Sequence, residues 1–201
     1  MDQREMWNDR YRQRGSVWGA APNQFVAAYL ADLEPCRILD VGAGQGRNAI
    51  WLAGRGHRVT AVDISDVAVA QGRELARDAG VDVEFIAADL AHWDPEPAAF
   101  DLVLLAYIQA PEEARRVIHE KATKALVPGG RVFIIAHHLD NLEHGVGGPQ
   151  SPERLYDEDK VAGDFAGFEV EDNKTVTRPV DKDGVTGDAI DLLFRAVKPS
   201  P

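Results

Sequence analysis

The sequence is poor in cysteine and in basic residues, and it has no long apolar run. Its single cysteine, Cys36, cannot form an internal disulfide, and its first residues lack the basic start and apolar run of a secretory signal, so we expect a cytoplasmic protein. No apolar stretch approaches the roughly 20 residues of a membrane-spanning helix, so we expect no membrane partner. The 33 acidic residues outnumber the 22 basic ones, and the net charge of -11 would repel a phosphate backbone. We therefore expect no nucleic-acid partner.

Length and periodicity predict one α/β domain over residues 1–201. Apolar residues make up 45% of the chain and charged residues 27%, which is typical of a globular protein. Short apolar runs alternate with longer helical stretches, a pattern that predicts a Rossmann-like parallel sheet with helices on both faces. The expected strands are 37–41, 58–62, 83–86, 101–105 and 131–136, and the expected helices are 46–55, 66–79 and 111–125.

Three further segments flank this core, which we place at 36–137. Residues 1–33 contain Trp7, Tyr11, Phe25 and Tyr29, which predicts amphipathic helices that act as a lid. Residues 140–152 are rich in Gly, Asn and Pro and predict a long functional loop near the acceptor. Residues 156–198 predict a helix at 156–165 and an antiparallel strand pair, 168–178 with 189–197, at the sheet's edge.

A glycine-rich loop follows the first expected strand and opens a helix. It reads Asp40-Val-Gly-Ala-Gly-Gln-Gly46, so its glycines are spaced G-x-G-x-G, whereas a dinucleotide-binding loop reads G-x-G-x-x-G. The carboxylate of Asp40 is poorly matched to a pyrophosphate but suits a cationic amino group. A bare strand-to-helix turn is the competing interpretation of these glycines.

Two more acidic residues follow strand ends. Asp63 comes about 20 residues after the loop, where a carboxylate can accept both hydroxyls of a ribose, a feature that NAD enzymes share. Asp89 lies just past the third strand, where it can accept from the amino group of an adenine or simply cap a helix.

The motifs around these residues resemble, in order, those of class I S-adenosylmethionine-dependent methyltransferases. They are Asp40-Val-Gly-Ala-Gly-Gln-Gly, Val62-Asp63, Ala88-Asp89-Leu90, Phe100-Asp101-Leu-Val and Leu126-Val-Pro-Gly-Gly130. The resemblance implies S-adenosyl-L-methionine as cofactor, with Asp40, Gly42, Ala43, Gly44 and Gly46 around its methionine part, Asp63 and Ile64 at the ribose, and Asp89 and Leu90 at the adenine. It also implies five parallel strands followed by the C-terminal antiparallel pair.

The N-terminal segment is similar to the lid of small tellurite-resistance and thiopurine-type methyltransferases. The likeness rests on Met6 to Tyr11, Val17-Trp18-Gly19 and Pro22-Asn23. It implies a small-molecule methyl acceptor, such as a thiol, a metalloid oxyanion or a heteroaromatic ring. An aromatic packing helix is the competing interpretation.

Acceptor-side candidates follow the fourth and fifth strands. The aromatic face of Tyr107 can attract a sulfonium by a cation–π interaction, or the ring can pack against a helix. His137 and His138 end the fifth strand, where alternation allows only one imidazole to face an acceptor and act as a base. The group His137, His138, Asp140, Glu143 and His144 lacks a metal-ligand spacing, so we expect no metal. We interpret Cys36 as a small buried hydrophobe.

Two other functions remain open from the sequence. An NAD-dependent oxidoreductase would share the loop and Asp63, but would predict the longer glycine spacing and an all-parallel ending. A non-catalytic S-adenosylmethionine-binding module would keep the cofactor residues and need no acceptor pocket. We expect a monomer or a homodimer.

Overall fold

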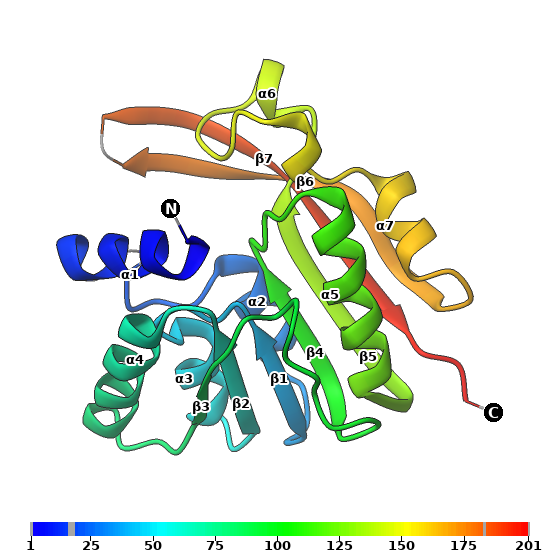
Figure 1. Cartoon of the computed structure of the whole chain (residues 1–201). Coiled ribbons are helices and arrows are strands. Elements are labelled where there is room, and N and C mark those ends of the chain that lie inside the picture. The colour runs from blue at the N-terminus through cyan, green and yellow to red at the C-terminus, as the bar shows by residue number, and fades with distance from the viewer. Residues whose placement is uncertain (1, 16–18, 183, 201) are drawn as a thin grey trace. The chain divides into compact units, whose positions relative to one another are not determined.

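A computed structural model describes residues 2–15, 19–182 and 184–200 (Figure 1). The helices are α1 (Gln3–Arg14), α2 (Gln24–Leu30), α3 (Arg47–Ala53), α4 (Asp66–Asp78), α5 (Glu112–Ala125), α6 (Asn141–His144) and α7 (Glu158–Asp164), with a 3-10 helix at Pro152–Arg154. The strands are β1 (Arg37–Val41), β2 (Arg58–Asp63), β3 (Glu84–Ala87), β4 (Phe100–Ala106), β5 (Leu126–His137), β6 (Glu169–Lys182) and β7 (Val185–Val197). No helix within the described residues is long and apolar enough to cross a membrane.

The chain forms two compact units that share β4. The first comprises residues 1–94 and 99–104, and the second comprises residues 95–98 and 105–201. In the first unit the strand order is β3-β2-β1-β4, with β1 and β3 each parallel to β2. In the second unit the end of β4 is followed by β5, β7 and β6. The predicted α/β class and the predicted strands are therefore confirmed, with bounds that differ by a few residues.

In the first unit, Phe85 of β3 sets how closely two helices approach the sheet. A Cβ atom at Gly46, before α3, would lie 2.6 Å from the Phe85 ring, and one at Gly72 of α4 would also lie 2.6 Å from it. Only glycine leaves room for the ring at both positions, so α3 and α4 pack tightly beside it. This packing fixes the start of α3, where the glycine-rich loop ends.

In the second unit, β7 pairs antiparallel with both β5 and β6. The two C-terminal strands thus form the predicted antiparallel pair, and they continue the sheet beyond β5 with β7 between β5 and β6. They are also longer than predicted, because β6 runs to Lys182 and β7 begins at Val185, so the expected connection over 181–187 is largely strand. Polar residues at both strand ends concealed this pairing from the hydrophobic pattern.

Helix α7 is shorter than the expected helix at 156–165. Tyr156 instead forms an isolated parallel bridge with His138, and its hydroxyl donates to the carbonyl of Ile108 at 2.8 Å. The helix begins after Asp157, whose carboxylate accepts from the amide of Lys160 at 2.8 Å and caps its first turn.

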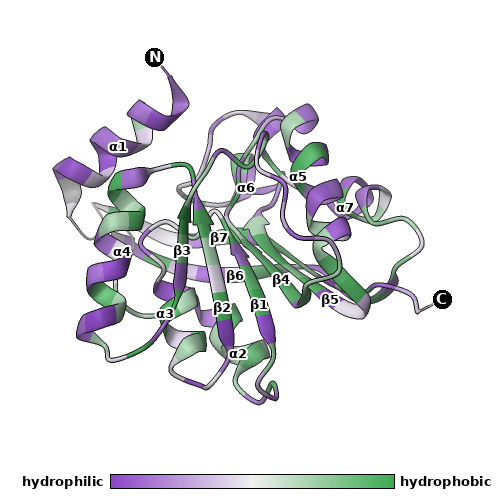
Figure 2. Ribbon diagram, turned by 60° about the horizontal axis from the view of Figure 1, so that its bottom comes forward, coloured by the Kyte–Doolittle hydropathy of each residue, from purple (hydrophilic) through white to green (hydrophobic). Residues whose placement is uncertain are grey.

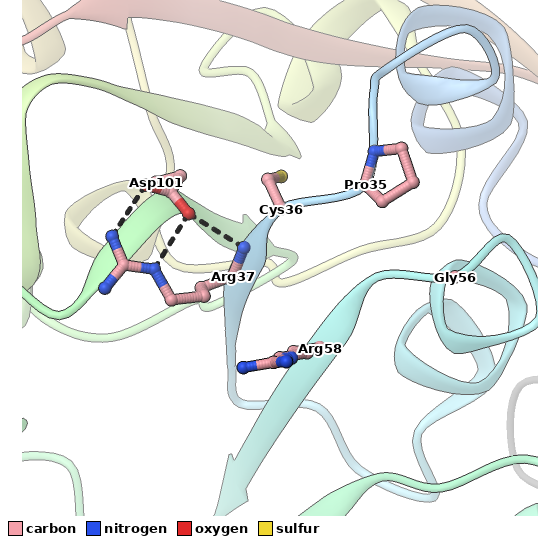
Figure 3. A pocket seen from close by; sticks show the side chains of 6 residues that line it. All are labelled: Pro35, Cys36, Arg37, Gly56, Arg58 and Asp101. Carbon is pink, nitrogen blue, oxygen red and sulfur yellow. Dashed lines mark hydrogen bonds and ion pairs between the residues drawn. The ribbon is translucent and has the colours of Figure 1, made fainter.

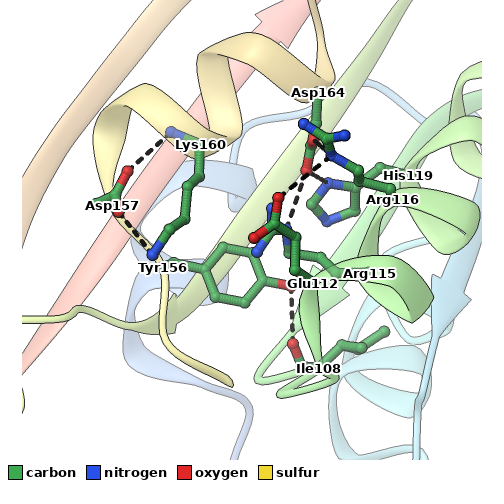
Figure 4. A network of polar contacts seen from close by, with 9 residues as sticks. All are labelled: Ile108, Glu112, Arg115, Arg116, His119, Tyr156, Asp157, Lys160 and Asp164. Atoms are coloured by element: carbon green, nitrogen blue, oxygen red, sulfur yellow. Dashed lines mark hydrogen bonds and ion pairs between the residues drawn. The ribbon is translucent and has the colours of Figure 1, made fainter. Parts of the chain in front are cut away.

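A buried ion-pair network joins α7 to α5 (Figure 4). The carboxylate of Asp164 accepts from Nε of Arg115 at 3.0 Å and lies 2.8 Å from Nδ1 of His119. Burial alone would raise the pKa of Asp164, but the hydrogen bonds from His119 and Arg115 outweigh it and lower that pKa. The network is internal to the second unit and stabilises the position of α7.

The N-terminal segment forms two helices, of which α1 packs against α4. Helix α1 is hydrophilic along most of its length (Figure 2), so it is not the amphipathic helix that the aromatic residues predicted. Tyr11 is nevertheless buried and packs against Ala68, with Trp7 beside it. The predicted lid residues Val17 and Trp18 lie outside the described residues, and the lid role stays a prediction.

Candidate functional site

The glycine-rich loop is held against the end of β2 by its own backbone. The amides of Gly42 and Ala43 both donate to the carbonyl of Val62, at 2.8 and 3.0 Å. Gly42, Gly44 and Gly46 all have positive φ angles, between 58 and 78°, which glycine adopts with little strain. The loop is therefore a tight turn that brings its backbone to the carboxyl ends of β1 and β2.

Asp40 is buried beside this loop. The residue is 1% exposed, and neither carboxylate oxygen makes a hydrogen bond of ordinary geometry with the described residues. Burial raises the pKa of Asp40 to about 7, although the charge of Arg47 and the amide of Ala49 act to lower it. A buried carboxylate of this kind is costly in the folded protein unless a ligand completes it.

Asp63 joins the glycine-rich loop to the residues after β3. One of its oxygens accepts from the amide of Gly44 at 2.7 Å and the other from the amide of Ser65 at 2.9 Å. Its own carbonyl accepts from the amide of Ala88 at 2.9 Å. Burial raises the pKa of Asp63, while the amides of Ser65 and Gly44 oppose that shift. A carboxylate has about four acceptor sites, so these hydrogen bonds leave acceptor capacity for a ligand hydroxyl.

Asp89 and Leu90 follow β3 in the same unit. The carboxylate of Asp89 accepts from the amide of Ala91 and lies beside Nδ1 of His92, each at 2.9 Å. Asp89 therefore does cap a local turn, as the competing interpretation held, and it keeps acceptor capacity for a ligand. Leu90 and Ile64 are both partly exposed, which leaves apolar surface next to the two carboxylates.

Helix α1 contributes two buried side chains next to the loop. A Cβ atom at Gly44 would lie 2.5 Å from the hydroxyl of Tyr11. Oδ1 of Asn8 accepts from the hydroxyl of Ser65 at 2.7 Å, two residues after Asp63. The sequence predicted that the N-terminal segment covers something, and in the structure α1 packs against the loop and the start of α4.

The acceptor-side candidates lie in the second unit, around a carboxylate that the sequence analysis missed. Asp191 of β7 is fully buried, and its Oδ2 accepts from the hydroxyl of Tyr107 at 2.7 Å and from Nε of Arg178 at 3.1 Å. Nε of Arg178 also donates to the Tyr107 hydroxyl at 3.0 Å. Tyr107 has a φ of 59°, an unusual conformation for a tyrosine, and the ring centroids of Tyr107 and His137 are 5.1 Å apart. Tyr107 is thus tied to a charged pair and does not simply pack against a helix.

His137 and His138 point to different partners, as alternation predicted. Nδ1 of His137 lies 3.1 Å from Oδ1 of Asp191. In His138, Nδ1 accepts from the amide of Asp140 at 3.1 Å and Nε2 lies 3.0 Å from a carboxylate oxygen of Glu158. His138 therefore connects β5 to the start of α7, which leaves His137 as the histidine of the Tyr107 cluster.

The predicted acceptor loop, 140–152, contains helix α6 and is fixed by Asn141. The side chain of Asn141 donates to the carbonyl of Gly147 at 2.9 Å and accepts from the amide of Ile190 at 2.7 Å. A Cβ atom at Gly148 would lie 2.9 Å from the His137 ring, so this glycine lets the loop cover the imidazole. Among residues 2–15, 19–182 and 184–200, no group of three His, Cys, Asp or Glu side chains could hold a metal ion.

Cys36 lines an open pocket of about 430 Å³ at the opposite strand ends (Figure 3). The residue is partly exposed, with Sγ 3.5 Å from Nδ1 of His57, so the prediction that it is buried was wrong. Arg37 crosses the pocket wall to Asp101 in a two-pronged ion pair, with N–O distances of 3.0 and 2.8 Å. Because this pocket lies where β1 and β2 begin, it is separate from the glycine-rich loop, which follows the end of β1.

Comparison with known proteins identifies the core. Residues 38–130 match the family described as "Methyltransferase domain". Residues 38–130, just under half of the chain, are thus similar to a methyltransferase domain. The chain is 34% identical over 115 residues to the ubiquinone biosynthesis O-methyltransferase of Idiomarina loihiensis. This match covers 54% of this chain and 45% of that protein. The chain is 30% identical over 137 residues to the tRNA 5-carboxymethoxyuridine methyltransferase of Escherichia coli K12, which covers 64% of this chain and 51% of the relative. The chain thus spans about half the length of these curated relatives.

Solved structures share the fold over nearly the whole chain. The 1,6-didemethyltoxoflavin-N1-methyltransferase of Burkholderia thailandensis, solved with its acceptor and S-adenosylhomocysteine bound, is 27% identical, with a TM-score of 0.73 over 98% of this chain and 87% of that one. TehB from Haemophilus influenzae is 18% identical, with a TM-score of 0.74 over 96% of this chain and 67% of that one, and shows the shared fold only.

Proposed function

We propose that this protein transfers the methyl group of S-adenosylmethionine to an oxygen or nitrogen atom of a small organic molecule. The observation that carries the proposal is the buried carboxylate of Asp40, which makes no hydrogen bond of ordinary geometry with the described residues and lies beside a loop built of glycines. The amino-acid part of S-adenosylmethionine bears a cationic amino group that can complete such a carboxylate. The pyrophosphate of NAD is anionic and would be repelled by it.

The remaining cofactor residues fit the same ligand. The backbone of Gly42, Ala43, Gly44 and Gly46 would border the methionine part, since no side chain at the three glycines obstructs it. Asp63 would hold the ribose through its remaining acceptor capacity, with Ile64 beside it. Asp89 and Leu90 would hold the adenine through an acceptor and an apolar contact.

The choice of a small-molecule acceptor rests on charge and on the relatives. The chain's net charge of -11 disfavours a phosphate backbone, although a tRNA methyltransferase is among its relatives. An O-methyltransferase and an N1-methyltransferase of small molecules are also among the matches. We favour oxygen and nitrogen acceptors over the thiols and metalloids of the tellurite-resistance and thiopurine-type group, whose likeness to this chain is confined to the N-terminal segment and the shared fold.

Calorimetric titration with S-adenosylmethionine, S-adenosylhomocysteine and NAD tests the cofactor assignment. We expect the first two to bind and NAD not to bind. Asp63→Asn should weaken the binding of S-adenosylmethionine and of S-adenosylhomocysteine by roughly 10- to 100-fold, because it replaces a charged hydrogen-bond acceptor by a neutral amide. Asp82→Asn changes an exposed acid of the same unit and should leave both affinities unchanged. Binding of NAD, or an undiminished affinity in Asp63→Asn, would refute the assignment.

Release of S-adenosylhomocysteine distinguishes an enzyme from a cofactor-binding module. The acceptors to test are a hydroxyquinolone, a heteroaromatic ring with an N–H group, and a thiophenol, each at the same concentration with saturating S-adenosylmethionine. We expect turnover with one of the first two classes. A protein that binds the cofactor but turns over none of the three would fit the binding module instead.

A further inference from the structure

In the second unit, a tyrosine, a histidine and an arginine surround the buried carboxylate of Asp191. Asp191 has no exposed surface, yet it lies within 3.1 Å of polar atoms from three other segments of the chain. Tyr107 follows β4, His137 ends β5 and Arg178 lies on β6. A buried carboxylate is stable only when paired in this way, so each partner has an electrostatic reason to remain in place.

The positions of these residues follow from strand pairing. Asp191 of β7 is directly opposite His137 of β5 and Val176 of β6. Arg178 is two residues beyond Val176, on the same face of β6, and reaches Asp191 diagonally. The positions of Asp191, His137 and Arg178 are therefore set by the sheet, and Tyr107 joins them from the residue that directly follows β4.

The contact between His137 and Asp191 is close but not yet aligned. Nδ1 of His137 and Oδ1 of Asp191 are 3.1 Å apart, and both atoms are buried without a hydrogen-bond partner. Catalytic hydrogen bonds are often long or poorly aligned before a substrate binds, so this separation is compatible with a hydrogen bond in the loaded enzyme. The His137 side chain is 13% exposed, so the ring is not sealed off from an acceptor.

We propose that Asp191, itself held by Arg178 and Tyr107, is a positioning residue that makes His137 the base for methyl transfer. With the Nδ1 proton directed to Asp191, the lone pair of Nε2 is free to take the proton of an acceptor O–H or N–H group. This inference rests on the proposed function and narrows its substrate class to acceptors that carry a proton on the nucleophilic atom.

The methyl transfer forms one bond, breaks another and releases one proton. A lone pair on the acceptor oxygen or nitrogen forms a bond to the methyl carbon, and the carbon–sulfur bond breaks with its electron pair remaining on sulfur. The acceptor proton passes to Nε2 of His137 and then to solvent. The products are the methylated acceptor and S-adenosylhomocysteine. A thiolate or another nucleophile that arrives already ionised would gain nothing from this base.

Nitrogen NMR of the two neighbouring histidines tests the geometry without any acceptor. A two-bond proton–nitrogen spectrum of the whole protein reports which ring nitrogen carries the proton. We expect the Nδ1–H form for His137 and the Nε2–H form for His138, because Nδ1 of His138 already accepts from the amide of Asp140. Asp191→Asn should abolish the preference of His137 and leave His138 unchanged. Asp188→Asn, an exposed site three residues away on β7, should change neither.

Kinetic measurements with the acceptor that the turnover assay identifies then distinguish a positioning role of Asp191 from a role in folding alone. We expect Asp191→Asn to lower kcat by about 100-fold, the lower end of what a general base contributes, with the affinity for S-adenosylhomocysteine unchanged. Tyr107→Phe removes one hydrogen bond to Asp191 and keeps the ring, so it should lower kcat less than Asp191→Asn. If His137 carries its proton on Nε2, or if Asp191→Asn leaves its tautomer unaltered, the inference is wrong even when the cofactor binds. A lost cofactor affinity with the expected tautomers would instead contradict the proposed function.

Discussion

Asp40 is a carboxyl group at a position where ionisation is unfavourable. Its pKa of about 7 in the folded protein lies far above the ordinary value of 3.8, because burial removes its water, and the charge of Arg47 and the amide of Ala49 only partly offset that loss. The folded protein therefore prefers the protonated form, while the unfolded chain ionises freely. As the pH rises from 3.8 to 7 this difference lowers the stability of the ligand-free protein, and the full penalty, about 4 kcal/mol, applies above pH 7.

Asp40→Asn should remove this pH dependence. Between pH 5 and pH 8 the unfolding free energy of the wild-type protein should fall, relative to that of Asp40→Asn, by about 2–3 kcal/mol. Urea unfolding at pH 5, 6.5 and 8 measures it, with the exposed site Asp82→Asn as control. Saturating S-adenosylhomocysteine should reduce the dependence, since its cationic amino group favours the ionised carboxylate. Parallel pH curves for the two proteins would show that Asp40 keeps an ordinary pKa.

Single residues differ in how far the sequence could reveal their roles. The places of Asp40 and Asp63 were predictable because each lies at the carboxyl end of a recognisable apolar strand, so its position could be counted. Asp191 was not predictable, because its partners come from three other segments: Tyr107 follows β4, His137 ends β5 and Arg178 lies on β6. Their approach depends on the register between β5, β7 and β6, which a single sequence does not contain.

At the scale of the element, α1 and the glycine-rich loop pack closely enough to constrain each other. Tyr11 of α1 is 3% exposed, and its hydroxyl would be 2.5 Å from a Cβ atom at Gly44. Because the ring is buried against Ala68, it cannot move aside without exposing apolar surface. A side chain at Gly44 should therefore displace α1 or distort the loop.

Gly44→Ala should lower the unfolding free energy by more than the cost of holding an alanine at a positive φ angle. Gly80→Ala is the matched control, since Gly80 has a φ of 68° and nothing within 4 Å of an added Cβ. We expect a cost of about 1–2 kcal/mol for Gly80→Ala and a clearly larger one for Gly44→Ala. Tyr11→Phe removes the clashing oxygen and should bring the cost of Gly44→Ala close to that of the control. Equal costs for the two alanine variants in the wild-type background would show that Tyr11 yields freely.

Whole elements were predictable where apolar periodicity was strong. The first four predicted strands match β1 to β4 within two residues at each end, and the third crossover helix matches α5 within one. The predicted helix at 156–165 was too long, because Tyr156 pairs with His138 before the capping residue Asp157 starts α7. The prediction of an amphipathic helix was wrong for α1, because its buried residues Asn8 and Tyr11 are not part of an apolar stripe.

For the whole molecule, charge bears on the choice between a small-molecule acceptor and RNA. Basic side chains could still gather locally despite the net charge of -11, and α1 carries several of them. In the structure, however, Arg12 is paired with Glu5 and Asp9 at 2.7 and 2.8 Å, and Arg4 is paired with Asp66 at 3.2 Å. The positive charges of Arg4 and Arg12 on this helix are therefore balanced by neighbouring carboxylates.

We accordingly expect no affinity for RNA. Binding to a phosphate backbone is driven by counterion release and strengthens steeply as salt falls, provided that the protein supplies unpaired cations. Fluorescence anisotropy with labelled tRNA and with a labelled RNA hairpin should show no binding at 150 mM salt and no gain at 50 mM. Arg12→Glu, which adds further negative charge to α1, should leave this result unchanged. Salt-sensitive binding that Arg12→Glu weakens would instead place RNA on α1, and the acceptor would then have to be sought among nucleotides rather than free small molecules.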